Sequence, residues 1–61
     1  MEYRIIHIGS EHLERYLTEN GIFGTWKNSM VFTSLTEALK ISENHDYNTA
    51  IVDTEGRICY W

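Results

Sequence analysis

Residues 49–61, TAIVDTEGRICYW, decide how the rest of the chain is interpreted. Two runs rich in β-branched and aromatic residues flank Asp53-Thr54-Glu55-Gly56, a sequence that suits a type I turn followed by a left-handed glycine bulge. In such a turn the Asp53 side chain can accept a hydrogen bond from the backbone two residues further on. The turn predicts a β-hairpin with these pairs: Asp53 opposite Arg57, Val52 opposite Ile58, Ile51 opposite Cys59 and Ala50 opposite Tyr60.

Upstream of this hairpin, hydrophobic patterns predict two helices and further strands. Residues 2–8 (EYRIIHI) favour a strand. Residues 11–19 place apolar side chains on one helical face, with Ser10 as N-cap and Gly21 in the left-handed position after the helix. Residues 22–26 are either a short strand or an irregular crossover, and residues 29–33 favour a strand. Ser34 and Glu37 form a capping-box pattern that opens a second helix, ending near residue 44.

Together these elements predict one small α+β domain spanning residues 1–61. The expected order is β-α-(β)-β-α-β-β, with two helices packed on a single-layer, mainly antiparallel sheet of four or five strands. A ferredoxin-like layout is one version of this order.

Composition excludes several classes of protein. The formal net charge is −4, which disfavours a general phosphate-backbone binder, and a 43% hydrophobic content disfavours a disordered chain. No apolar run is long enough to span a bilayer, and no secretory hydrophobic region follows Met1. Cys59 is the sole cysteine, so no internal disulfide can form. We therefore expect a protein of a reducing compartment, the cytoplasm.

The hairpin is unusual because both of its faces are apolar. Ala50, Val52, Ile58 and Tyr60 are expected on one face, and Ile51, Cys59 and Trp61 on the other. Two helices can cover only one face of a four-stranded sheet, so apolar surface is left over, and such patches usually mark partner sites. The alternative is that residues 22–29 cover the second face. We expect binding of a protein partner or a second copy at the following residues: Tyr3, Ile5, Ile51, Cys59 and Trp61.

No motif for catalysis, metal binding or cofactor binding emerges. Ser10 is better explained as a helix cap than as a nucleophile for His12, and Cys59 with His7 lacks an orienting third group. The three histidines follow no metal-ligand spacing, and the glycines match no phosphate-binding loop. We therefore expect no cofactor, no metal and no enzymatic activity. Small acidic chains of this kind are often accessory or inhibitor proteins, including phage-encoded ones.

Residues 21–41 resemble part of the small hybrid-binding domain found at the N-terminus of some RNases H. The matching positions are Gly21, Ile22, Phe23, Thr25, Trp26, Phe32, Glu37 and Ala38. The chain departs from that family because it leaves no room for the helix after the tryptophan and lacks most of the basic residues. The resemblance implies an alternative function, a module that binds single strands or RNA/DNA hybrids through Phe23, Trp26 and Lys27.

Overall fold

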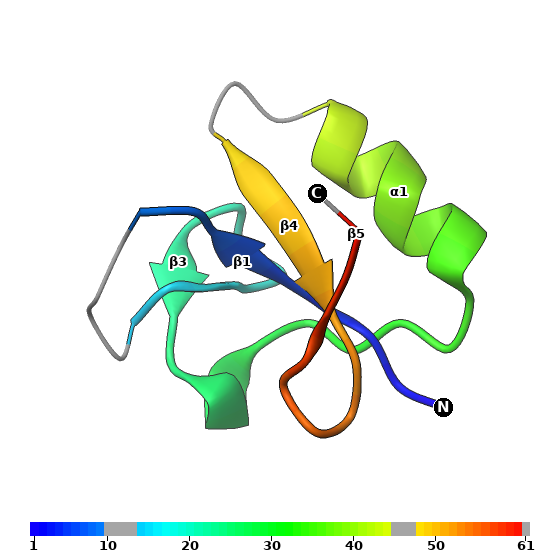
Figure 1. Cartoon of the computed structure of the whole chain (residues 1–61). Helices are drawn as coiled ribbons and strands as arrows, with labels where there is room; N and C mark the ends of the chain where they lie inside the picture. Colours follow the sequence, from blue (N-terminus) through cyan, green and yellow to red (C-terminus); the bar gives the residue numbers. More distant parts are fainter. Residues whose placement is uncertain (10–13, 45–47, 61) are drawn as a thin grey trace.

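A computed structural model describes residues 1–9, 14–44 and 48–60 of the chain. These residues form a five-stranded antiparallel sheet and one α-helix, so the α+β class is confirmed (Figure 1). The strand order is β3-β2-β1-β4-β5. The elements are β1 (Arg4–His7), β2 (Tyr16–Leu17), β3 (Phe23–Gly24), the 3₁₀ helix η1 (Trp26–Asn28), α1 (Leu35–Glu43), β4 (Thr49–Val52) and β5 (Ile58–Tyr60).

The first predicted helix is wrong over residues 14–19, where the chain forms β2 instead. A tight turn explains the difference: the Thr18 N–H donates to the Ile22 carbonyl (2.9 Å), and the Gly21 N–H donates to the Thr18 carbonyl (3.1 Å). Gly21 has a φ of 79°, the left-handed conformation we expected, but it closes the β2–β3 hairpin rather than ending a helix. Residues 10–13, with the expected cap Ser10, lie outside the described residues.

The strand predicted at residues 29–33 is also wrong, and the choice left open for residues 22–26 is settled as β3 followed by η1. Phe32 makes a single bridge to Tyr3, and the Met30 N–H donates to the Leu17 carbonyl (2.9 Å). A longer ladder cannot form here because β1 already has β2 on one side and β4 on the other. This segment therefore crosses the sheet as extended chain.

The C-terminal hairpin is confirmed, with one change in register. Asp53 Oδ1 accepts hydrogen bonds from the backbone N–H groups of Glu55 and Arg57 (both 2.9 Å), and Gly56 has a φ of 81°. Val52 lies opposite Ile58 as predicted. A β-bulge follows, so Ile51 lies opposite Tyr60, and the predicted pairs Ile51–Cys59 and Ala50–Tyr60 are wrong.

The second predicted helix is confirmed as α1, although the Ser34 side chain makes no capping hydrogen bond. Ala38 is buried, and the hydroxyl groups of Ser42 and Thr49 are hydrogen-bonded to each other, which ties α1 to β4. With one helix among the described residues and this strand order, the ferredoxin-like layout is not formed. The hydrophobic core consists of Ile5, Leu17, Phe32, Ala38 and Ile51.

The β2–β3 hairpin has no room for a side chain at position 24. A Cβ there would lie 2.8 Å from Cγ2 of Thr18, whose hydroxyl is held by donating to the Ile22 carbonyl (2.8 Å). Replacing glycine with alanine ordinarily stabilises a chain slightly. We predict instead that Gly24→Ala lowers the free energy of unfolding by about 1–3 kcal/mol, measured by urea denaturation, because the clash forces the hairpin apart.

The matched control for this prediction is Thr18→Ser in the Gly24→Ala background. Serine keeps the hydroxyl that bonds Ile22 but lacks the clashing methyl group, so the double variant should recover most of the lost stability. A Gly24→Ala chain as stable as wild type would contradict this geometry.

Candidate functional site

Three of the five residues expected at the partner surface lie in or against the core. Ile5 and Ile51 are directly opposite each other on β1 and β4, and both are 0% exposed. Tyr3 is half-buried and packs against the same cluster. These side chains lie on the face that α1 covers, so in this fold Ile5 and Ile51 cannot touch a partner. Trp61 lies outside the described residues.

The opposite face of the sheet is covered in part by Trp26, as in the alternative that residues 22–29 supply a cover. Arg4 lies over the Trp26 ring, 3.8 Å from the centroid, and Tyr16 meets that ring edge-on at 5.1 Å. Arg4 Nε donates to Ser29 Oγ (2.8 Å), and Ser29 Oγ donates to the Trp26 carbonyl (2.5 Å). This cluster accounts for the burial of Arg4, a charged residue that sequence reasoning passed over.

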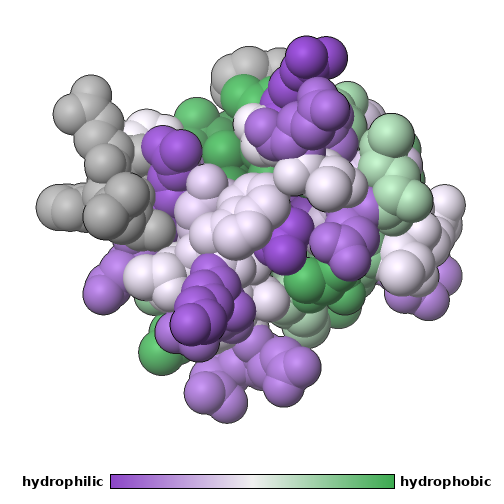
Figure 2. Space-filling model, turned by 90° about the horizontal axis from the view of Figure 1, so that it is seen from below, coloured by the Kyte–Doolittle hydropathy of each residue, from purple (hydrophilic) through white to green (hydrophobic). Residues whose placement is uncertain are grey.

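The surface seen from below carries no continuous apolar patch. Figure 2 shows pale and purple residues across most of this view, with green confined to separate spots. The 3₁₀ helix η1 and the β4–β5 turn lie on this side of the molecule in Figure 1.

Strand β5 carries exposed apolar surface at one edge of the sheet, because all three of its residues are exposed. Ile58 is 43% exposed and Tyr60 49%, and Cys59, between them, is an exposed free thiol. Strand β5 pairs only with β4, while α1 packs on β4 and β1. Ile58 lies opposite Val52 and Tyr60 opposite Ile51, so they point to different faces of the sheet, and each face has an exposed apolar side chain at this edge.

Sequence reasoning identified Cys59 but missed Ile58 and Tyr60. It did place an apolar excess on this hairpin, and among the expected partner residues that the structure describes, Cys59 is the exposed one. The bulge between Ile51 and Val52 moves Tyr60 to the face where Cys59 was expected. No feature of the sequence pattern marks this bulge.

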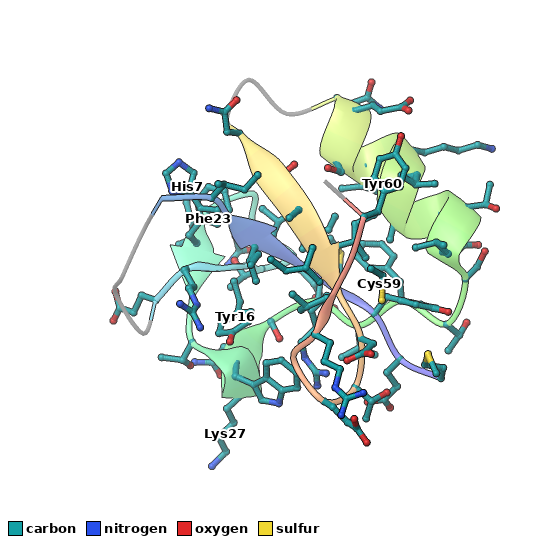
Figure 3. All side chains as sticks on the ribbon, in the orientation of Figure 1. His7, Tyr16, Phe23, Lys27, Cys59 and Tyr60 are labelled. Carbon is teal, nitrogen blue, oxygen red and sulfur yellow. The ribbon has the colours of Figure 1, made fainter. Side chains whose placement is uncertain are left out.

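The three residues of the nucleic-acid alternative do not share one face. Phe23 lies near His7, with ring centroids 5.3 Å apart, and packs against the core on the α1 side. Trp26 lies on the opposite face against Tyr16, and Arg4 covers one side of its ring. Lys27 is exposed and lies far from Phe23 (Figure 3). A stacking platform that combines both aromatic rings is therefore not formed.

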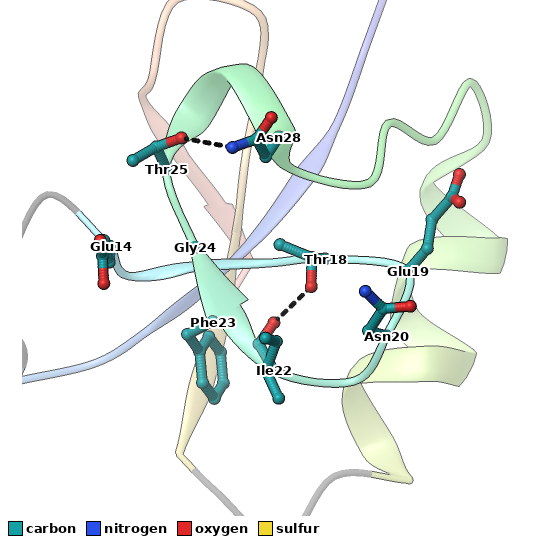
Figure 4. A pocket seen from close by; sticks show the side chains of 9 residues that line it. All are labelled: Glu14, Thr18, Glu19, Asn20, Ile22, Phe23, Gly24, Thr25 and Asn28. Carbon is teal, nitrogen blue, oxygen red and sulfur yellow. Dashed lines mark hydrogen bonds between the residues drawn. The ribbon is translucent and has the colours of Figure 1, made fainter.

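An open groove of about 500 Å³ lies along the β2–β3 hairpin at the other edge of the sheet (Figure 4). Two carboxylates line it, Glu14 and Glu19, at opposite ends of the hairpin strand that contains β2. Ile22, 64% exposed, gives it an apolar side. Further lining residues are Thr18, Asn20, Phe23, Gly24, Thr25 and Asn28. Sequence reasoning missed this groove because it assigned residues 14–19 to a helix.

The described residues offer little catalytic chemistry. They contain no group of three or more His, Cys, Asp or Glu side chains that could hold a metal ion. His7 on β1 and Cys59 on β5 are separated by β4, and His7 lies beside Thr49 whereas Cys59 lies beside Ile51 and Val52, so more than about 10 Å, two strand spacings, separates them. Ser10, His12 and His45 lie outside the described residues. No helix in the described part of the chain is long and apolar enough to cross a membrane.

Comparison with known proteins adds no assignment. No protein-family model, curated protein or solved structure matches this chain.

The Arg4–Trp26 contact provides a test of the cover on the second face. We predict that Arg4→Lys lowers the free energy of unfolding by about 1–2 kcal/mol in urea denaturation, because lysine lacks both the Nε donor to Ser29 and a planar group to lie over Trp26. The control is Arg57→Lys, whose side chain is 79% exposed and should change stability by less than about 0.5 kcal/mol. Equal losses of unfolding free energy in the two variants would show that the contact between Arg4 and the Trp26 ring contributes nothing specific to stability.

Proposed function

We propose that this protein is a non-enzymatic interaction module that presents β5 to a protein partner. The observation that supports this is an apolar edge strand, Ile58–Tyr60, whose three residues are all exposed. Sheet edges expose unpaired backbone groups, and proteins that do not use them protect them with very short strands, bulges, charges, proline or a covering element. Strand β5 is short and has a bulge against β4, but it carries no charge and no proline within its three residues.

The energetics fit a contact that depends on a partner. Fully burying an isoleucine or tyrosine side chain yields about 1.5–3 kcal/mol, and Ile58 and Tyr60 are each about half exposed. A partner strand added along β5 gains main-chain hydrogen bonds as well. Three residues alone supply less than the roughly 800 Å² per partner of a standard interface, so the partner must also reach surfaces beside β5.

A protein of another kind fits this edge better than a second copy of the chain. Two copies would each carry a net charge of −4, and that repulsion opposes self-association. An accessory or inhibitor role, with or without a phage origin, is consistent with a small acidic chain that acts by binding. The nucleic-acid alternative has less support, because Phe23 and Trp26 lie on opposite faces.

The lone cysteine makes this proposal directly testable. A maleimide photo-crosslinker attached to Cys59 reports what contacts β5 when the labelled chain is irradiated in a lysate of the cell that makes it. We predict one defined adduct with a protein, which is lost when Ile58→Lys places a charge beside the label. The adduct should remain when Ile22→Lys places the same charge at the other edge of the sheet.

A label at another exposed position is the control for random contacts. In a Cys59→Ser, Lys40→Cys chain the label sits on α1 and should not give the same adduct. The same adduct from both positions, or one that survives Ile58→Lys, would overturn the proposal. An adduct between two copies in purified protein would identify a second copy as the partner.

A further inference from the structure

Strand β5 offers a partner backbone groups as well as side chains, and the direction of those groups restricts what the partner can be. We infer, resting on the proposed function, that the partner protein binds as an extended strand that pairs in a β-ladder with Ile58 at the open edge of the sheet. A helix or a loop packed on the side chains of β5 satisfies the proposed function but not this arrangement.

The hairpin turn sets the direction of the Ile58 backbone. The Asp53 N–H donates to the Arg57 carbonyl (2.9 Å), and the Arg57 N–H donates to Asp53 Oδ1 (2.9 Å), so both backbone groups of Arg57 face the β4 side of the hairpin. Successive residues of an antiparallel strand turn their N–H and C=O groups alternately to its two sides. The N–H and C=O of Ile58 therefore point away from β4, to the side where β5 has no neighbouring strand among the described residues.

The pairing of β4 with β1 leads to the same direction independently. The His7 N–H donates to the Arg15 carbonyl on the β2 side of β1 (2.8 Å), so by alternation the backbone groups of Arg4 face β4. Arg4 lies opposite Val52, and the backbone groups of Val52 therefore face β1. Because they are turned away from β5, Val52 and Ile58 oppose each other as a non-hydrogen-bonded pair.

The β-bulge centres this opening on Ile58. Cys59 and Tyr60 together oppose Ile51, whose backbone groups face β5 because those of the next residue face β1. The regular edge that a partner strand meets is therefore one residue long. That residue supplies one donor and one acceptor, the two groups that form a hydrogen-bonded pair.

Side chains define the chemistry of the strand that fits here. A residue paired with Ile58 carries its side chain on the same face, beside an isoleucine that is 43% exposed. The next residue of the partner points to the opposite face, where Tyr60 is 49% exposed. Apolar cross-strand neighbours stabilise such pairs, so the partner strand carries a β-branched or aromatic residue opposite Ile58 and an apolar residue beside Tyr60.

The direction of the Ile58 backbone is tested first, by amide hydrogen exchange of the free full-length chain followed by NMR. After correction for sequence, the Ile58 amide should exchange at nearly the rate of an unstructured chain. The Asp53 amide in the same hairpin, which donates to the Arg57 carbonyl, should exchange more slowly. An Ile58 amide that exchanges as slowly as that of Asp53 would overturn the inference.

Methylation of the Ile58 backbone nitrogen then tests the contact with the partner. The added methyl group removes the N–H and blocks the open edge, but the isoleucine side chain is kept, and a chain of 61 residues is accessible to chemical synthesis. Unlabelled chains compete with the chain photo-labelled at Cys59 for its adduct in the lysate. The chain methylated at Ile58 should need at least about tenfold more competitor than the unmodified chain, because the partner loses a hydrogen bond and keeps an unpaired carbonyl.

The matched control is a chain methylated on the backbone nitrogen of Leu35, the first residue of α1. A helix tolerates the loss of this N–H because it has no acceptor within the helix. This chain should compete within about twofold of the unmodified chain. Both methylated chains should remain folded in urea denaturation, and selective unfolding by methylation at Ile58 would show that its N–H belongs to the β4–β5 ladder and overturn the inference.

The outcomes separate the strand pairing from the proposed function. Equal competition by the unmodified chain and the chain methylated at Ile58 would overturn the strand pairing and leave β5 as the binding surface. The absence of any adduct that Ile58→Lys removes would overturn the proposed function and the strand pairing with it. An adduct between two copies would assign the added strand to a second copy and overturn its assignment to a different protein.

Discussion

The pairing of β1 with β4 is the constraint on which the rest of the structure depends. Ile5 and Ile51 face each other across these two strands and are completely buried beneath α1. Because side chains alternate along a strand, burying Ile5 on one face sends Arg4 to the other. There Arg4 meets Trp26 and holds the segment that follows β3 against the sheet. A shift of one residue in this register would bury a charge under the helix and expose the core.

Two turns of the chain have nearly the same construction, and only one was recognised from the sequence. In Asp53-Thr54-Glu55-Gly56 and in Thr18-Glu19-Asn20-Gly21, a left-handed glycine stands fourth and its N–H donates to the carbonyl of the first residue. The side chains of the first residues differ, because Asp53 accepts hydrogen bonds and the Thr18 hydroxyl donates one. The first follows a run of β-branched residues, which identified it as a hairpin. The second follows Tyr16 and Leu17, whose spacing from Leu13 also fits a helix. A two-residue strand is too short to show a period of two, so hydrophobic periodicity could not separate the alternatives.

The sequence predicted the hairpin on which the candidate surface lies, but of the exposed residues of β5 it identified only Cys59. An excess of apolar residues on the C-terminal hairpin could be predicted from the sequence, because alternation puts them on both faces. Which face α1 covers could not be predicted, since this depends on tertiary packing, and that choice buries Ile5 and Ile51. The bulge beside Ile51 then determines which residues of β5 share a face with it. The groove could not be anticipated at all without the β2–β3 hairpin.

The exposure of β5 follows from the area that this short chain has available to cover its sheet. Five strands at about 4.8 Å spacing make a sheet roughly 24 Å wide, whereas one helix of about 10 Å covers two strands. Helix α1 lies over β1 and β4, the crossing segment with Met30 and Phe32 packs beside β1 and β2, and Trp26 covers part of the second face. Among the described residues, these covering elements lie over the middle of the sheet and leave its two edges open. Strand β5, the surface proposed for binding, and the β2–β3 groove lie at those edges because the covering elements end there.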